Sequence, residues 1–158
     1  MLSNKEKAIV QSAADIACQL HKGQKDKAGV DYFTGHLTAV AKMGRTWKEQ
    51  VVGFLHDASE DTPNSVEQVL NLLDEKLETP LSNNDREELT VALRLLNHHL
   101  APDRETYIQR IKCNALAKAV KLHDLTHNMD LSRIPNPTQK DYERVERYKS
   151  EYDYLSRL

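Results

Sequence analysis

Cysteine, glycine, proline and aromatic residues are all scarce in this sequence of 158 residues. It contains two cysteines, five glycines, five prolines, two phenylalanines and one tryptophan. Because β-sandwiches need many turn residues, this scarcity favours helices joined by short turns. The cysteines, Cys18 and Cys113, lie in helix-like segments without the spacing of a metal-binding pair. We expect both to be small buried side chains in a reducing compartment, in preference to a disulfide.

A charge excess of either sign is also absent, as is any long apolar run. The 22 basic and 24 acidic residues give a formal net charge of −2. This balance argues against binding to a nucleic-acid duplex or to an anionic membrane surface, while a locally basic pocket for a small anion stays open. The charged first residues do not resemble a signal peptide, and no run approaches the ~20 apolar residues of a membrane span. We therefore expect a cytoplasmic protein.

Apolar residues recur every three to four positions along most of the chain, and no segment shows the alternation of a β-strand. The pattern predicts a final helix after Thr138 and seven earlier ones, over about 4–20, 36–43, 47–60, 66–77, 87–98, 104–111 and 114–131. The expected N-caps are Ser3 or Asn4, Thr46, Asn64 or Ser65, and Thr138. The chain thus fits one all-α domain of about seven or eight helices, spanning residues 1–158.

Metal-ligand residue types cluster at the end of the predicted third helix. His56 and Asp57 directly follow an apolar run, and Glu60 and Asp61 come four residues after each of them. On one helix these four side chains would form an acidic patch within one turn. Three carboxylates this close repel one another unless a cation neutralises them, which favours a metal site. The alternative is a solvated helix end before Pro63, although acidic residues there oppose the helix dipole.

A second group of polar side chains lies in the predicted helix over residues 114–131. Asp124 and Asn128 are four residues apart and share one face, which suits a ligand followed by a group that positions substrate or water. His123 and His127 have the same spacing and offer a separate metal pair. They lack the companion acid of a His-Glu-x-x-His motif, so facing solvent or capping polar neighbours is the favoured interpretation.

His36, at the start of the predicted second helix, gives a third element of the site. Taken alone, it fits a partly buried histidine as well as a ligand. Together with His56, Asp57 and Asp124 it makes a mixed nitrogen and oxygen set, which suits manganese, iron or a similar divalent ion better than calcium.

The order and spacing of these motifs resemble the hydrolase domain of the RelA/SpoT family, and especially its small stand-alone alarmone hydrolases. The resemblance runs from about residue 5 to residue 133. The motifs that carry it are His21–Tyr32, His36, His56–Asp57, Glu60–Thr62, Lys121–Asp124 and Asn128–Met129.

The resemblance implies an all-helical HD fold that binds one manganese ion and removes the 3′-pyrophosphate from guanosine tetra- and pentaphosphate. It implies that the metal ligands are His36, His56, Asp57 and Asp124. It further implies that Glu60 and Asp61 orient and activate the attacking water, that Asn128 lies near the ribose and phosphate, and that Lys27 lies near the phosphates. With Lys25, Lys27 is a candidate to hold the outgoing phosphates.

Several positions depart from the family pattern and leave the identity of the base open. The arginine that packs on guanine in the family is Asp26 here, which cannot stack as a guanidinium does and would repel a phosphate. Leu37 replaces a proline after His36, and Gly35 is an added residue before it. Leu131 occupies a position that is often polar. The segment 104–110 offers substitute cations or, alternatively, ordinary surface charge.

The departures therefore leave three functions to consider. They are an alarmone hydrolase, an HD nucleotidase or pyrophosphohydrolase for another nucleotide, and a non-catalytic nucleotide sensor. The final helix carries Tyr148, Tyr152, Tyr154, Leu155 and Leu158, and we expect it to close the domain over the core. A surface for self-association is the alternative.

Overall fold

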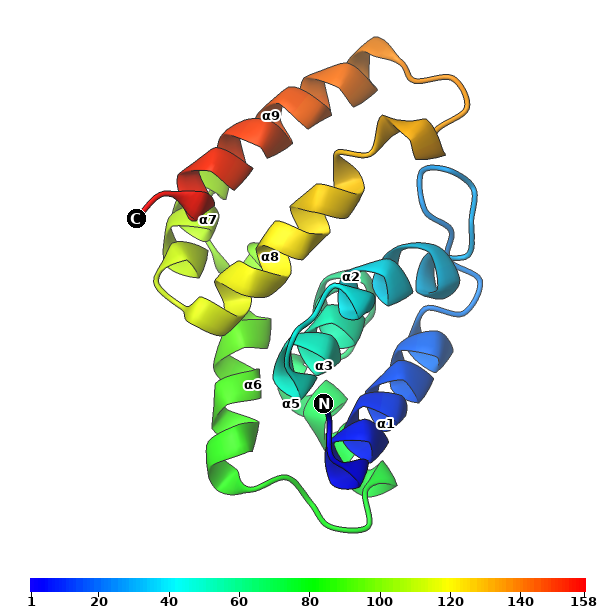
Figure 1. Cartoon of the computed structure of the whole chain (residues 1–158), viewed down its shortest axis with the longest axis vertical. Coiled ribbons are helices and arrows are strands. Elements are labelled where there is room, and N and C mark those ends of the chain that lie inside the picture. Colours follow the sequence, from blue (N-terminus) through cyan, green and yellow to red (C-terminus); the bar gives the residue numbers. More distant parts are fainter.

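The computed structural model describes residues 1–158 and is helical throughout (Figure 1). The helices are α1 Asn4–Leu20, α2 Thr38–Lys42, α3 Trp47–Leu55, α4 Ala58–Asp61, α5 Val66–Lys76, α6 Asn83–Leu95, α7 Arg104–Lys112, α8 Ala115–Asn128 and α9 Gln139–Ser156. A π-helical turn, η1, covers Phe33–Leu37, and two 3₁₀ turns, η2 and η3, cover His98–Leu100 and Leu131–Arg133. The predicted all-α class is confirmed. No helix is long and apolar enough to cross a membrane.

The helix starts follow from local hydrogen bonding that the sequence already displays. Ser3, Thr46, Ser65 and Thr138 each accept a bond from the backbone N–H three residues later. Each therefore satisfies one of the donors that a helix start leaves unpaired. These four predicted N-caps are confirmed, with Ser3 and Ser65 chosen over their neighbours. α6 begins four residues earlier than expected because Ser82 caps it through the backbone N–H of Asp85.

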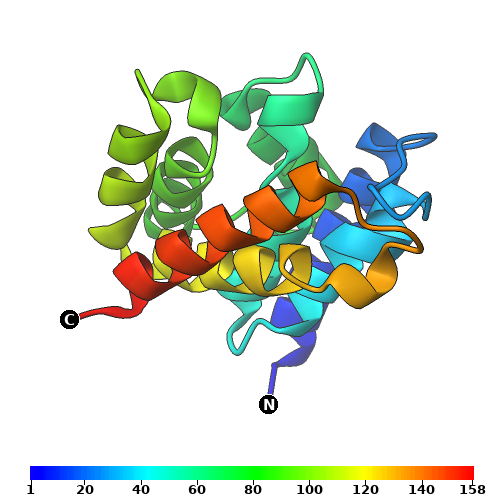
Figure 2. The same cartoon turned by 90° about the horizontal axis from the view of Figure 1, so that it is seen from above.

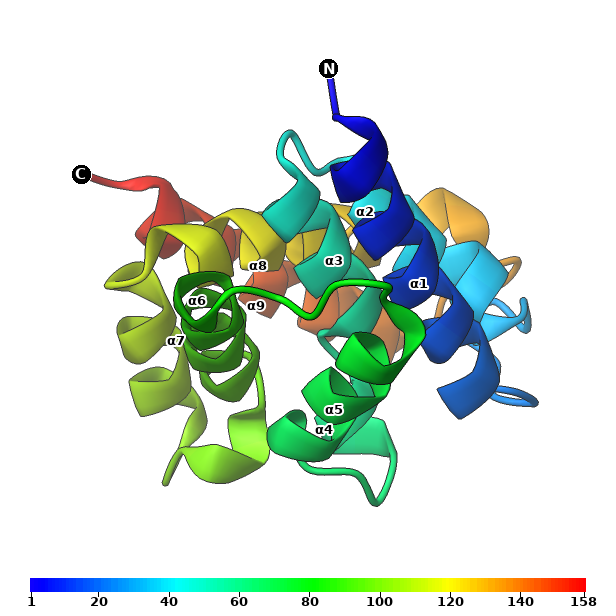
Figure 3. The ribbon, with the colours of Figure 1, turned by 90° about the horizontal axis from the view of Figure 1, so that it is seen from below.

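The hydrophobic core surrounds α3, which packs against α1, α2, α6 and α8 (Figure 3). Val51, Val52 and Leu55 are fully buried on this helix. Gly53 lets α2 approach closely, since a Cβ atom at this position would lie 2.8 Å from the Cα atom of Ala41. The α2 and α3 segments, and the polar residues at their ends, are therefore held side by side.

Two breaks in helical regularity occur where the sequence pattern predicted polar ligands. The helix predicted over 47–60 is interrupted after Leu55, and His56 and Asp57 form the junction to α4. Gly35 lies in η1, the π-helical turn that also contains His36. A π-turn holds one residue more than an α-helical turn without ending the helix, so α2 continues directly from η1.

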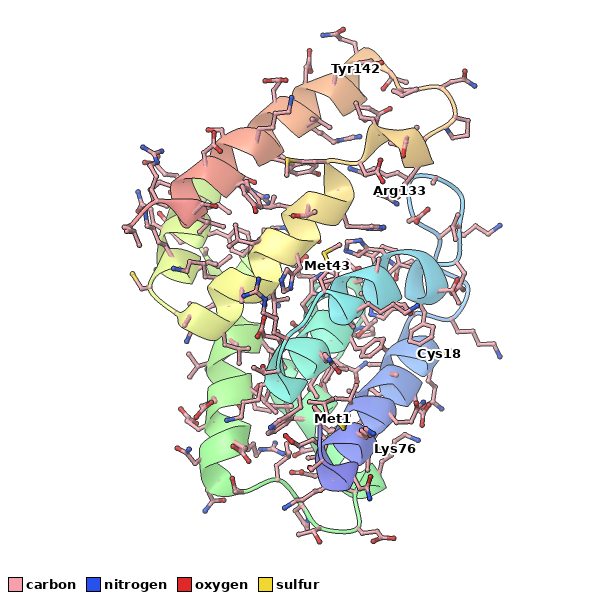
Figure 4. The ribbon with its side chains drawn as sticks, in the orientation of Figure 1. Met1, Cys18, Met43, Lys76, Arg133 and Tyr142 are labelled. Atoms are coloured by element: carbon pink, nitrogen blue, oxygen red, sulfur yellow. The ribbon has the colours of Figure 1, made fainter.

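The expectation that both cysteines are buried is wrong. Cys18 and Cys113 are exposed free thiols. The buried face of α1 is formed by Ile9, Ala13 and Ala17, and Cys18 lies off that face (Figure 4). Cys113 lies just past the end of α7, where its backbone closes the helix.

The last helix, α9, runs alongside α8 in the opposite direction and also contacts α7 (Figure 1 and Figure 2). Its buried side chains include Val145, Tyr148 and Leu155, which confirms that it closes the core. Leu158, by contrast, is fully exposed beyond the helix. The buried Glu151 faces α7 from the same side of α9 and pairs with Arg104.

Candidate metal centre

Three buried side chains from separate elements converge between η1, α3 and α8. His36 comes from η1, His56 from the end of α3, and Asp124 from α8, and one ligand atom of each lies within 4.8 Å of the others. The Nε2 atom of His36 is 3.0 Å from Oδ1 of Asp124, and Nε2 of His56 is 3.6 Å from the same oxygen. This group could bind a metal ion.

Asp57 adds a second carboxylate to the centre. Its Oδ2 atom lies 3.2 Å from Nε2 of His56 and 3.7 Å from Nε2 of His36. The hydroxyl of Tyr32 donates a 2.5 Å hydrogen bond to this oxygen, which fixes the carboxylate. Burial, and then the nearby Asp57 charge, raise the pKa of Tyr32, so the phenol keeps its proton and remains a donor. The four predicted ligands therefore lie together.

The local backbone sets the ring of His56 for coordination. Its Nδ1 atom is 2.7 Å from the carbonyl oxygen of Gly53, a contact in which the ring N–H donates. The proton on Nδ1 leaves Nε2 as the lone-pair nitrogen of a neutral ring. Nε2 of His56 is buried and has no hydrogen-bond partner, although it faces two carboxylates. A ligating cation would satisfy this atom, so the residues fit a metal.

The electrostatics of the centre also favour a cation. Burial opposes a charge on His56, but the carboxylates of Asp57 and Asp124 raise its pKa well above the ordinary value, so they favour a positive charge at Nε2, either a second ring proton or a ligating cation in its place. Asp124 is buried as well, and Lys121 and the two histidines hold its pKa well below the ordinary value. Nζ of Lys121 lies 2.8 Å from Oδ2 of Asp124, so it compensates part of the negative charge on the side away from the histidines.

His36 has a partner that the sequence pattern did not identify. Its Nδ1 atom is 2.8 Å from Nδ1 of His127, one turn beyond Asp124 on α8. Burial, the charge of Arg133 and the proximity of His36 lower the pKa of His127 to about 4. His127 is therefore neutral near pH 7. The structure pairs His127 with His36 and not with His123, in contrast to the separate metal pair considered from the sequence.

Glu60 and Asp61 contact different segments of the chain. Oε1 of Glu60 accepts from the backbone N–H of His98 at 2.7 Å and lies 2.8 Å from its ring Nδ1. Oδ2 of Asp61 accepts a 3.1 Å bond from the Gln24 amide, whose oxygen is 2.8 Å from Nδ1 of His21. Burial, followed by the Asp57 charge, raises the pKa of Asp61. Because Glu60 and Asp61 have different hydrogen-bond partners, the acidic patch predicted for one helix turn is split between two sets of contacts.

A cavity of about 180 Å³ opens onto the centre. Asn128 lines it and donates a 3.1 Å hydrogen bond to Oδ1 of Asp124. The other lining residues come from the loop before η1, from η1, from the junction of α3 and α4, and from α4, η2, α7, α8 and α9: Tyr32, His36, His56, Asp57, Glu60, His98, Arg104, Tyr107, Lys121, Asp124 and Tyr148. Arg104 belongs to the segment 104–110, which the sequence offered as a source of cations, and its guanidinium lines the cavity. Two hydrogen bonds to the carboxylate of Glu151, at 2.8 and 2.9 Å, orient this guanidinium.

The two lysines predicted to contact phosphate lie in the exposed loop between α1 and η1. Lys27 reaches the edge of the cavity, where its Nζ atom is 3.5 Å from the hydroxyl of Tyr148. Lys25 is exposed and forms an isolated backbone bridge with Asp31. Neither lysine lines the cavity.

Asp26 is turned into its own loop and does not line the cavity. Its Oδ1 atom accepts from the backbone N–H groups of Ala28 and Val30 at 2.9 and 3.0 Å. Its Oδ2 atom is 3.3 Å from Nη1 of Arg133, which lies beside this loop in Figure 4. The absence of a side chain at Gly35 leaves room for this carboxylate, since a Cβ atom there would lie 2.8 Å from Oδ2. Arg133 thus compensates the negative charge of Asp26, which the family resemblance placed near the phosphates.

Sequence reasoning assigned no role at the centre to Tyr32, His98 or Lys121, and it considered His127 only as a partner of His123. Lys121 and His127 lie three residues before and after Asp124, so their helical spacing was an available signal. Tyr32 and His98 reach the centre through contacts between distant segments, for which spacing gives no signal. No family model matches this chain.

Proposed function

We propose that this protein is a metal-dependent phosphohydrolase of the HD type that removes the 3′-pyrophosphate from guanosine tetra- and pentaphosphate. The observation that carries the proposal is the convergence of His36, His56, Asp57 and Asp124 on one buried centre beside a polar cavity. The orphaned Nε2 atom of His56 supports a metal there. The motif order, which resembles the RelA/SpoT hydrolase domain, supports the substrate.

In this proposal the two histidines and two carboxylates hold a single divalent ion. The mixed nitrogen and oxygen donors suit Mn²⁺ or another divalent transition metal. When bound, such an ion supplies Lewis acidity toward a phosphoryl oxygen and acidifies water.

The proposed roles of the surrounding side chains follow from their contacts. Glu60 or Asp61 accepts a proton from the attacking water, with Glu60 held by His98 and Asp61 held by Gln24. Asn128 lies beside Asp124 and donates toward the ribose or a phosphate with its remaining amide N–H. Attack of water on the phosphorus bonded to the 3′-oxygen would break the P–O3′ bond, so charge would build on the phosphoryl oxygens and on the 3′-oxygen, which takes up a proton. Arg104 at the cavity and Lys27 at its edge are the cationic side chains that would stabilise this charge.

A pyrophosphohydrolase that acts on another nucleotide is the second candidate. It is favoured by the placement of Asp26, which is occupied by its loop and by Arg133 and presents no stacking group to a guanine. A non-catalytic sensor is less well supported, because Glu60 and Asp61 accompany a complete set of proposed ligands.

The experiment is Mn²⁺-dependent release of pyrophosphate from guanosine tetraphosphate, compared with simple nucleotides and 3′-phosphorylated nucleotides. Asp57→Ala should abolish release, while the control Asp85→Ala, which alters an ion pair with Lys48 on the surface, should leave it unchanged. Release only from a different nucleotide would support the second candidate. No hydrolysis of any nucleotide by protein that binds Mn²⁺ would contradict the enzymatic proposal.

A further inference from the structure

The contact between His36 and His127 joins a proposed metal ligand to a side chain outside the ligand set. The two Nδ1 atoms are 2.8 Å apart, and the ring centroids are 5.0 Å apart. His36 is buried, with 3% of its surface exposed. Two nitrogens at this distance require one ring to donate its N–H and the other to accept.

The direction of this hydrogen bond decides whether His36 can coordinate a cation. If His36 donates from Nδ1, its Nε2 atom, directed at Asp57 and Asp124, carries the lone pair. If His127 donates instead, a neutral His36 must carry its proton on Nε2, which would then point at the position of the cation. Only the first arrangement is compatible with coordination by Nε2.

We infer that His127 is a positioning residue for the metal centre and accepts the Nδ1 proton of His36. In this role it corresponds to the Gly53 carbonyl, which accepts the Nδ1 proton of His56. Both rings thus present Nε2 to the same space. α8 supplies Asp124 as a ligand and, one turn later, the acceptor that orients a ligand from η1. Such outer partners fix the tautomer and the ring orientation of ligating histidines.

The inference rests on the metal centre of the proposed function and is independent of its substrate. It is tested by the affinity for Mn²⁺ alone, measured by calorimetry and by the paramagnetic resonance of free Mn²⁺. His127→Leu removes the acceptor and should weaken Mn²⁺ binding about 10- to 100-fold. His127→Asn keeps an oxygen acceptor close to the position of Nδ1 and should restore most of that loss. His123→Leu, four residues earlier on α8, changes a ring whose buried Nδ1 atom has no hydrogen-bond partner; it is the control and should bind Mn²⁺ as the wild type does.

Circular dichroism of each variant separates loss of the acceptor from loss of the fold. If His127→Leu does not fold, the comparison of His127→Asn with His127→Gln, whose longer side chain displaces the acceptor, provides the test: Asn should bind Mn²⁺ more tightly. Equal affinity of folded His127→Leu and wild type would overturn the inference, as would a folded His127→Asn no better than Leu or Gln. Absence of Mn²⁺ binding by the wild type would instead overturn the metal centre itself. Mn²⁺ binding without nucleotide hydrolysis would overturn the proposed activity and leave the His127 comparison valid.

Discussion

Lys121 is a buried cation whose charge is compensated by a single carboxylate, that of Asp124. It is 6% exposed, its Nζ atom lies 2.8 Å from Oδ2 of Asp124, and it faces the ring of Tyr107 at 5.3 Å. Burial opposes its charge, yet Asp124 holds the pKa of Lys121 above the ordinary value, so the pair is ionised. Removing one partner of a buried pair leaves the other uncompensated, which costs more than the pair contributes.

We therefore expect Lys121→Met to lower the free energy of unfolding by about 3–5 kcal/mol. Mn²⁺ should restore part of this loss, because a cation at the centre also compensates Asp124. Urea denaturation with and without Mn²⁺ measures both effects. The matched control is Lys48→Met, which removes a surface lysine paired with Asp85 and Glu88 and should change stability by about 1 kcal/mol or less. Equal losses in the two variants would contradict the role of burial.

Asp61 and Gln24 give a second prediction at the residue scale. Burial and the Asp57 charge raise the pKa of Asp61, whereas the hydrogen bond from Gln24 lowers it. A base must be ionised, so hydrolysis should fall as the pH drops through this raised pKa. Gln24→Leu removes the opposing hydrogen bond and should move the acidic limb of the pH–rate profile to higher pH.

Asp61→Asn should lower kcat by about 10²- to 10⁴-fold if this residue is the base. Gln11→Leu, which alters a surface bond to Asp15, is the control for the Gln24 substitution. An acidic limb that does not move in Gln24→Leu would exclude Asp61 and leave Glu60 as the base.

At the scale of elements, the close contact between α2 and α3 holds the two histidine-bearing segments together. Because Gly53 has no Cβ atom, the backbone of α3 can lie close to the Cα and N atoms of Ala41 in α2. Alanine favours a helix by about 1 kcal/mol over glycine. The methyl group of an alanine at position 53 would nevertheless contact the backbone of Ala41, which can move away only if α2 and α3 separate.

Gly53→Ala is therefore expected to destabilise the protein by about 1–3 kcal/mol, in spite of its better helix propensity. Separation of α2 from α3 should also move His36 away from His56 and weaken Mn²⁺ binding. Thermal unfolding and Mn²⁺ titration of this variant measure the two effects. Increased stability, as expected from propensity alone, would show that the helices adjust without cost.

The helices themselves could be predicted from the sequence because their signals are local. A cap such as Thr46 acts on a backbone N–H three residues away, and periodic apolar residues mark the buried face. The interruption at His56–Asp57 and the π-turn around Gly35 could not be located by periodicity. Both are short changes in backbone geometry, over two residues at His56–Asp57 and five at Phe33–Leu37, within otherwise helical segments. The two exposed cysteines were mispredicted because Cys18 lies off the buried face of α1 and Cys113 lies past the end of α7.

For the molecule as a whole, the centre is assembled from segments far apart in the chain. Tyr32 reaches Asp57, His98 reaches Glu60, and Arg104 is oriented by Glu151 on α9. The ligand types were recognisable from composition and motif order, whereas these supporting contacts join segments far apart in the chain and form only when those segments have packed. Metal binding should therefore be coupled to folding of the entire domain, because the unfolded chain lacks the converged ligands.

This coupling predicts that Mn²⁺ raises the thermal midpoint of unfolding. A ligand that binds only the folded state, at 100 times its Kd, contributes about 2.7 kcal/mol. For a domain of this size, each 1 kcal/mol shifts Tm by roughly 2–4 °C, so an increase of about 5–11 °C is expected. Asp124→Asn removes a ligand charge and should show little of this shift, whereas Asp85→Asn on the surface should show all of it. Calorimetric scans with Mn²⁺ and with a chelator measure the difference. A shift of the same size in Asp124→Asn would mean that Mn²⁺ stabilises the fold from another position.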